Sequence, residues 1–213
     1  MSPHGNTMRA LLATAGVRLR RGQAIPMRIP FSRNQLPVFC RSRGFLRGAE
    51  IGVWRGAFTA AFCKANPKLH MLAVDPWLNY PAWKDTKNDM PLEEAERLMA
   101  GSLAEAYARL TPLNCTIMRD FSHLAAAQVP DGSLDFAYID GDHGYDAVLR
   151  DLTLWAPKVK SGGWVGGHDY RYFSNKPTIQ VIPAVIDYTD EHAIEPWFVL
   201  AGDKTPSFLW VVQ

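Results

Sequence analysis

One stretch, from Gly48 to Trp77, constrains the fold of this chain more than any other. It contains a short apolar run at 48–53, an amphipathic helical pattern at 57–65 and a second apolar run at 69–74. Two strands joined by a helix within about 30 residues form a βαβ unit, which implies a parallel sheet. The sequence therefore predicts an α/β fold with a doubly wound, Rossmann-like sheet.

The turn between the first strand and the helix carries two glycines, Gly52 and Gly56, and the strand before it carries Glu50. Because glycine has no Cβ, a ligand can approach the backbone closely at this turn. Asp75 ends the second apolar run, at the carboxyl edge where sheets of this type bind ligands. We expect Asp75 to bind both hydroxyls of a ribose, so these residues predict a nucleoside pocket.

The pattern Glu50-x-Gly52-x-x-x-Gly56, followed by Asp75, resembles the first two motifs of class I S-adenosylmethionine-dependent methyltransferases. The resemblance implies that these four residues bind S-adenosylmethionine. The alternative is a nucleotide-binding oxidoreductase, whose G-x-G-x-x-G signature has a third glycine and another spacing. An acid within the first strand would also repel a pyrophosphate, whereas a cationic methionine moiety would tolerate it.

The loop after Asp75 spans 76–90 and contains two prolines and three large aromatic residues, Trp77, Tyr80 and Trp83. One interpretation is a loop that its aromatic side chains anchor to the body of the protein. The other is a lid over the substrate, with Trp77 facing the adenosine. A helix is predicted directly after it, over 91–110, from the spacing of its apolar residues.

A third strand is predicted at 115–119, and Asp120, Phe121 and Ser122 follow it. In the methyltransferase pattern this corner holds the adenine. The resemblance therefore implies that Phe121 packs on the base and that Asp120 or Ser122 bonds to its edge. Either polar residue could also cap the short helix that follows.

Two further apolar runs end in ionisable residues. The first run ends at Asp140 and the second at His168 and Asp169. The turn after the first of them adds Asp142 and His143. Because the carboxyl ends of parallel strands share one edge, we expect all five side chains beside the cofactor. Five ionisable groups at one edge indicate a functional site, since burying unpaired charges is costly.

The turn from Asp140 to His143 resembles that of a methyltransferase subgroup with an Asp-Gly-Asp-His turn, and more distantly the metal-dependent catechol O-methyltransferases. The resemblance implies that Asp140 also borders the cofactor, that Asp140 and Asp169 bind a divalent cation such as Mg²⁺ or Mn²⁺, and that His143 is the catalytic base. Without a metal, Asp142 or Asp169 could orient His143.

One position departs from the metal-binding pattern. The amide that should follow the second metal-binding acid is Tyr170 here, and tyrosine is a poor ligand for a hard cation. Asp142 or His168 could fill the gap, and a histidine ligand would favour Mn²⁺, Fe²⁺ or Zn²⁺ over Mg²⁺. We therefore include His168 among the candidate metal ligands.

The two ends of the chain complete the expected domain organisation. A helix at 179–192 and strands at 197–201 and 207–212 predict an antiparallel C-terminal hairpin, as in class I methyltransferases. Residues 1–45 are expected to form a basic helical cap or extension, irregular over 23–37, that covers the cofactor or makes a homodimer contact. Residues 46–213 would then be the methyltransferase domain.

Charge and cysteine content narrow the function classes. Residues 1–47 hold nine arginines and no acid, which leaves open a non-catalytic protein that binds nucleic acid. That segment has few aromatics and no nucleic-acid motif, which argues against a nucleic-acid partner. Three cysteines without a CxxC pair suggest a cytoplasmic protein, and no apolar run reaches the ~18 residues of a membrane span. The sequence thus predicts methyl transfer from S-adenosylmethionine to a small molecule, with a hydroxyl as the expected acceptor group.

Overall fold

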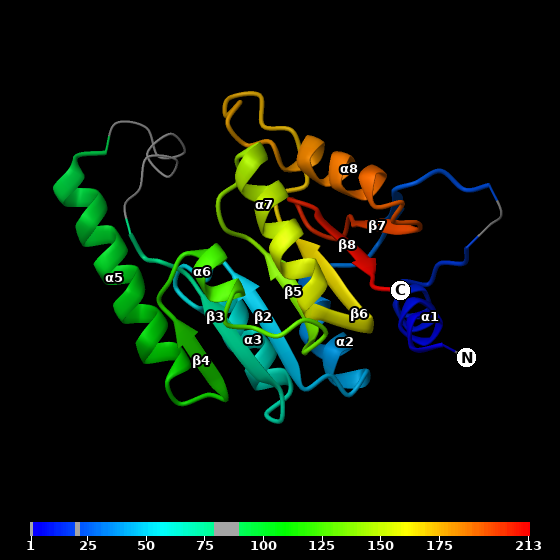
Figure 1. Ribbon diagram of the computed structural model, residues 1–213, viewed down its shortest axis with the longest axis horizontal. Coiled ribbons are helices and arrows are strands. Elements are labelled where there is room, and N and C mark those ends of the chain that lie inside the picture. The colour runs from blue at the N-terminus through cyan, green and yellow to red at the C-terminus, as the bar shows by residue number, and fades with distance from the viewer. Residues whose placement is uncertain (1, 20–21, 79–89) are drawn as a thin grey trace.

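The computed structural model describes residues 2–19, 22–78 and 90–213. Tyr80 and Trp83, and with them most of the loop expected as a lid, lie outside the described residues. The described chain forms one eight-stranded sheet with helices on both faces (Figure 1). This confirms the predicted α/β, doubly wound architecture.

The strands lie across the sheet in the order β1-β7-β8-β6-β5-β2-β3-β4. Their bounds are β1 Met27–Ile29, β2 Arg47–Ile51, β3 His70–Val74, β4 Cys115–Met118, β5 Leu134–Ile139, β6 Val159–Gly167, β7 Trp197–Leu200 and β8 Ser207–Val211. The helices are α1 Pro3–Thr14, α2 Leu36–Ser42, α3 Ala57–Ala65, α5 Leu92–Leu110, α6 Ser122–Ala126, α7 Tyr145–Trp155 and α8 Val181–Glu191, with short 3₁₀ turns η1 Arg33–Gln35 and η2 Ala156–Lys158.

The four central strands place the predicted acids side by side. β3, β2, β5 and β6 are neighbours and pair in parallel. Asp75, Asp140 and Asp169 follow the ends of three of these strands, and Glu50 is the second-to-last residue of β2. The candidate site therefore lies where the βαβ pattern predicted it, at the carboxyl edge of the parallel part of the sheet.

Alternation along each strand divides the core into two layers. In β5, Ala137 and Ile139 pack with α6, α7 and α8, whereas Phe136 and Tyr138 pack with α1, α2 and α3. Helix α7 lies in front of the sheet in Figure 1. Every residue of β5 is buried. Its sequence is a continuous apolar run with one charged residue, Asp135, as expected for a strand that is covered on both faces.

The C-terminal hairpin is confirmed. β8 is antiparallel to both of its neighbours, β6 and β7. The turn that joins β7 to β8 contains Asp203, whose carboxylate accepts hydrogen bonds from the Ser32 hydroxyl and the Arg33 backbone N–H. The hairpin thus also holds the N-terminal part of the chain in place.

The N-terminal segment is more regular than the sequence predicted. Residues 23–37 were expected to be irregular, but β1 pairs in parallel with β7 and η1 follows it. β1 has only three residues, of which Met27 and Ile29 are buried, and so short an alternation gives no sequence signal. Helix α1 packs beside β6, where the Thr7 hydroxyl donates to the Gly162 carbonyl at 2.6 Å. The sheet therefore begins within the segment expected as an extension.

Within residues 2–19, 22–78 and 90–213, no helix combines the length and the apolar character needed to cross a bilayer.

Candidate active site

A cavity of about 700 Å³ opens at the carboxyl edge of the central strands. Most of the residues predicted from the sequence line it: Gly52, Asp75, Phe121, Ser122, Asp140, Asp142, His143 and Asp169. The others, which do not line it, are Glu50, Gly56, Trp77, Asp120 and His168. One edge of the sheet thus gathers residues from the loops after five strands, β2 to β6, around one space.

The two glycines after β2 are required by the backbone. Gly52 and Gly56 have φ values of 91° and 73°, a region that favours glycine. A Cβ at Gly52 would lie 2.3 Å from the carbonyl oxygen of Asp140, and one at Gly56 would lie 3.0 Å from the Leu110 side chain. Gly52 therefore allows the ends of β2 and β5 to approach each other at the cavity wall, whereas Gly56 serves the packing of α3 on α5.

Glu50 lies beneath the cavity rather than in its wall. Its side chain is 2% exposed and accepts a hydrogen bond from the Thr59 hydroxyl. Burial raises the pKa of Glu50 to about 8, against the lowering effect of that bond. A carboxyl with so high a pKa repels a pyrophosphate less than an ordinary carboxylate does, which weakens that ground for excluding a nucleotide.

Asp75 is fixed by backbone donors on both of its oxygens. Oδ2 accepts from Trp54 N at 2.9 Å and Oδ1 accepts from Trp77 N at 2.8 Å. Both tryptophans have positive φ values, 52° and 46°, which turn their N–H groups toward the carboxylate. Burial raises the pKa of Asp75, and these backbone bonds oppose the rise. Each oxygen keeps a lone pair with which to accept a ribose hydroxyl.

The structure corrects the position expected for Trp77. Its side chain is 3% exposed, packs in a core cluster with Val53 and Leu110, and donates its indole N–H to the Trp54 carbonyl at 2.6 Å. Trp54 lines the cavity instead. The sequence placed Trp77 after the acid, but the backbone turn that binds Asp75 directs its indole into the core.

At the corner after β4, Phe121 and Ser122 line the cavity and Asp120 does not. Phe121 is 38% exposed and lines the cavity, whereas the Asp120 carboxylate accepts from Phe121 N at 2.9 Å. The Ser122 hydroxyl donates to Asp151 at 2.6 Å and accepts from the Trp155 indole at 2.9 Å. Neither Asp120 nor Ser122 caps α6 with its side chain. Asp151, which the sequence analysis did not single out, also lines the cavity.

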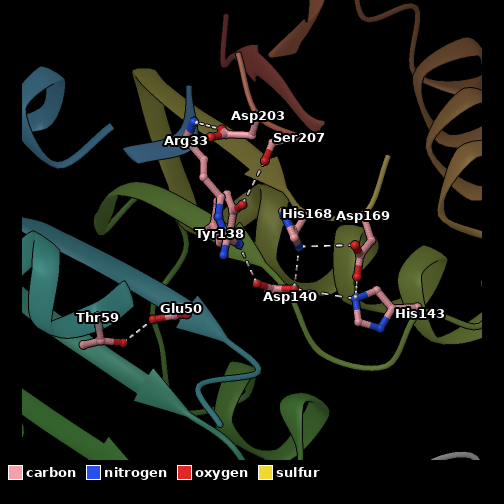
Figure 2. A network of polar contacts seen from close by, with 10 residues as sticks. All are labelled: Arg33, Glu50, Thr59, Tyr138, Asp140, His143, His168, Asp169, Asp203 and Ser207. Atoms are coloured by element: carbon pink, nitrogen blue, oxygen red, sulfur yellow. Dashed lines mark hydrogen bonds and ion pairs between the residues drawn. The ribbon is translucent and has the colours of Figure 1, made fainter. Parts of the chain in front are cut away.

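Two carboxylates, Asp140 and Asp169, and two imidazoles, His143 and His168, form a cluster after the ends of β5 and β6 (Figure 2), and all of them except His168 line the cavity. His143 Nε2 lies 2.9 Å from Asp169 Oδ2 and 3.5 Å from Asp140 Oδ1. His168 Nδ1 lies 3.4 Å from Asp169 Oδ1 and 3.6 Å from Asp140 Oδ1. Of the two orienting acids considered for His143, the contact is therefore with Asp169.

The contacts within this cluster reverse the effect of burial on each group. Burial lowers the pKa of the two imidazoles, but Asp140 and Asp169 raise it to about 10 for His143 and about 9 for His168. Burial raises the pKa of the two carboxyls, but the imidazoles lower it below the ordinary value for aspartate. At neutral pH the cluster therefore contains two anions and two cations.

Three groups of this cluster have the arrangement of cation ligands. One ligand atom each from Asp140, His143 and Asp169 lie within 4.8 Å of one another. His143 Nε2 is buried and, among the described residues, has no aligned hydrogen bond despite the two carboxylates beside it. Two carboxylates and an imidazole fit Mn²⁺, Fe²⁺ or Zn²⁺ better than Mg²⁺. Asp142 is outside this set, since its Oδ1 accepts from Gly144 N at 2.9 Å.

Arg33 contacts the site from the N-terminal segment, and the sequence analysis missed it. Its Nη1 donates to Asp140 Oδ2 at 3.2 Å, and its guanidinium lies 5.0 Å from the centre of the Phe58 ring. Figure 2 shows Asp140 between Arg33 on one side and the two histidines on the other. Asp140 therefore has cationic neighbours on both of its oxygens.

The only local signal near Arg33 is a helix-start pattern. Ser32 and Gln35 form a capping box around η1, which is visible in the sequence as Ser-x-x-Gln. That pattern predicts the turn but not its destination. Arg33 and Asp140 are 107 residues apart, so their contact depends on the pairing of β1 with β7.

Comparisons with known proteins agree with this geometry. Residues 49–170 match the model of a family described as a methyltransferase domain. The structure is similar to an O-methyltransferase from Bacillus cereus in complex with SAH, with 13% identity, a TM-score of 0.60, and 98% of this chain and 91% of that one covered. It is also similar to the O-methyltransferase NovP, with 19% identity, a TM-score of 0.59, and 85% and 79% covered. At these identities the likeness concerns the fold.

A curated relative matches only a short region. Uncharacterized protein R132 of Acanthamoeba polyphaga mimivirus is 40% identical over 57 residues, which are 27% of this chain and 24% of that protein. The chain thus aligns with about a quarter of the length of this relative.

Proposed function

This chain belongs to the methyltransferase domain family and has the class I fold of S-adenosylmethionine-dependent enzymes, and on that premise we propose that it methylates a hydroxyl group of a small molecule. One observation carries the proposal. The ends of five neighbouring strands surround a single cavity, with the expected nucleoside-binding residues Asp75 and Phe121 after β3 and β4 and the cluster of acids and histidines after β5 and β6. The cavity volume suits a nucleoside and a small acceptor.

The nucleoside side would hold the donor. Asp75, fixed by two backbone N–H groups, accepts the ribose hydroxyls, and the exposed face of Phe121 packs on the base. Gly52 leaves room for the methionine part where β2 and β5 come together. Asp140 lies next to this point and can interact with the cationic end of the donor.

The reaction itself needs alignment more than activation of the donor. The acceptor oxygen attacks the methyl carbon, the new C–O bond forms as the C–S bond breaks, and the sulfonium becomes a neutral thioether. Holding oxygen, carbon and sulfur in line supplies much of the rate enhancement. The remaining requirement is removal of the hydroxyl proton, because a neutral hydroxyl is a poor nucleophile.

His143 is our candidate for that proton, with Asp169 as the group that orients it. A pKa of about 10 keeps His143 protonated at neutral pH, so it becomes a base only when another cation takes up the charge of the two carboxylates. A divalent cation held by the carboxylates of Asp140 and Asp169 would also lower the pKa of the acceptor and orient it. In that arrangement His143 serves as the base and not as a ligand, and His168 is the other imidazole beside the two acids. The two roles are therefore linked through the same pair of acids.

Titration calorimetry with S-adenosylhomocysteine tests the proposal directly. We expect binding with chelator present, because the group of candidate metal ligands found among the described residues, Asp140, His143 and Asp169, lies in the acid–histidine cluster and does not include Asp75. Transfer of labelled methyl groups to a panel of hydroxyl-bearing small molecules should then depend on added Mn²⁺. Absence of nucleoside binding would refute the proposal, and binding with transfer only to nitrogen acceptors would refute its hydroxyl part.

The homodimer expected from the N-terminal region stays a prediction, which light scattering would test.

A further inference from the structure

Asp151 in α7 is a buried carboxylate on the cavity wall that the proposed methyl transfer does not use. It is 4% exposed and lies at the nucleoside side of the cavity, which Phe121 and Ser122 also line. Burying a carboxylate is costly unless donors satisfy its oxygens. The partners of its two oxygens therefore indicate what the group is for.

The first oxygen has a partner whose direction is fixed. An indole N–H can only donate, so Trp155 Nε1 uses the Ser122 hydroxyl as an acceptor, at 2.9 Å. The single proton of that hydroxyl is then donated to Asp151 Oδ1 at 2.6 Å. Ser122 consequently has no proton left for a ligand, although the sequence pattern suggested that it binds the edge of the base.

The second oxygen, Oδ2, has no hydrogen-bond partner among the described residues. It lies beside Gly141, where an added Cβ would be 3.7 Å from it, and Gly141 also lines the cavity. An ionised carboxylate only accepts hydrogen bonds. The wall of the nucleoside side therefore presents an acceptor to whatever binds there.

We propose that Asp151 selects the base of the cofactor, with Oδ2 accepting a hydrogen bond from the exocyclic amine of adenine. A 6-aminopurine presents an N–H donor at this position, whereas a 6-oxopurine presents a carbonyl oxygen that the carboxylate would repel. Asp151 is thus a specificity-determining residue for the donor. The inference rests on the proposed function, because it requires a nucleoside in this cavity.

Asp151→Asn exchanges the cavity-facing atom with little change in shape. The Ser122 proton still needs an acceptor, so the amide oxygen of the variant should face Ser122. The amide nitrogen then takes the place of Oδ2 and presents a donor to the cavity. The variant should therefore lose the preference for the amine and accept the carbonyl.

The measurement is the affinity of S-adenosylhomocysteine and of S-inosylhomocysteine by calorimetry at pH 8. Burial raises the pKa of Asp151 to about 6, so the group is ionised at that pH. We expect the wild type to prefer the adenosyl compound by about 100-fold or more, since a site that leaves a buried polar group unpaired rejects the analogue strongly. In Asp151→Asn the ratio should fall to about 10 or below.

Two variants complete the test. Asp146→Asn is the matched control, because the same substitution at an exposed position in the same helix should leave the ratio unchanged. Asp120→Asn is the competitor: if it removes the preference and Asp151→Asn does not, the proposal is overturned. Thermal melting of each variant shows whether it is folded.

The wild type alone already separates the two hypotheses. If it binds neither compound, the proposed function fails. If it binds both compounds equally, the cavity holds a nucleoside but Asp151 does not select its base, and only this inference fails. That comparison stands even if Asp151→Asn does not fold.

Discussion

The two sides of the cavity use the same residue type in opposite electrostatic settings. At the nucleoside side, Asp75 and Asp151 accept hydrogen bonds from neutral donors, namely backbone N–H groups and a hydroxyl. Burial raises the pKa of both, although the Arg150 cation opposes the rise for Asp151. At the other side, Asp140 and Asp169 have imidazole partners, and their pKa is lowered. The first setting suits recognition of neutral donors such as ribose hydroxyls and an amine, and the second suits the handling of a proton or a cation.

The strongest test of this contrast is His143→Ala. If the acid–histidine side handles the proton, the variant should lose about 10²–10⁴-fold in turnover, the usual contribution of a general base. Affinity for S-adenosylhomocysteine should change little, because His143 lies at the other side of the cavity. His70→Ala is the control, since His70 is bonded to Asn114 and Thr116 away from the cavity. Normal turnover of His143→Ala would remove our choice of base.

The pH dependence of activity tests the charge state of the same group. With chelator, residual activity should rise by about tenfold per pH unit from pH 7 toward the His143 pKa of about 10, because only the neutral imidazole accepts a proton. Saturating Mn²⁺ should move the rise to lower pH, since the cation takes up the carboxylate charge. A flat profile under both conditions would contradict this view of His143.

Asp75→Ala probes the nucleoside side. Loss of the carboxylate removes two acceptors for the ribose, and bonds to a charged group contribute about 1.5–3 kcal/mol. Affinity for S-adenosylhomocysteine should therefore fall by about 10–100-fold, while the pH profile of turnover keeps its shape. Asp131→Ala, at an exposed ion pair with Lys158, is the control. A shifted pH profile in Asp75→Ala would contradict the assignment of cofactor binding and proton transfer to separate sides of the cavity.

Arg33→Gln should have the smallest effect. It removes one partly buried ion pair with Asp140, so we expect a loss of about 1 kcal/mol and a Tm lower by about 2–4 °C. With one cation removed from Asp140, the pKa of His143 should rise, and the activity profile should shift to higher pH. Arg28→Gln, an exposed arginine of β1, controls for charge. An unchanged profile would show that Arg33 acts only on stability.

Sequence reasoning worked where the signal was local. The helices near 57–65, 91–110 and 179–192 and the C-terminal hairpin were predicted from apolar spacing and turn residues, and all are present. It failed for β1, whose three residues are too few for a periodic pattern. It left two positions open for Trp77, anchored in the body of the protein or facing the adenosine, because the direction of an indole depends on a backbone turn that forms only around Asp75. The structure supports the anchored position.

By itself, the sequence determined that the chain forms a parallel sheet and that its acids lie at one edge, because both follow from the periodicity of each segment and from where each strand ends. Only the tertiary structure decided the partner of each acid. Arg33 lies at Asp140 because β1 joins the far end of the sheet, and Asp151 faces the cavity because Trp155 and Ser122 fix its other oxygen. The pKa values of these carboxyls, and hence their chemistry, are set by contacts between segments that lie far apart along the chain.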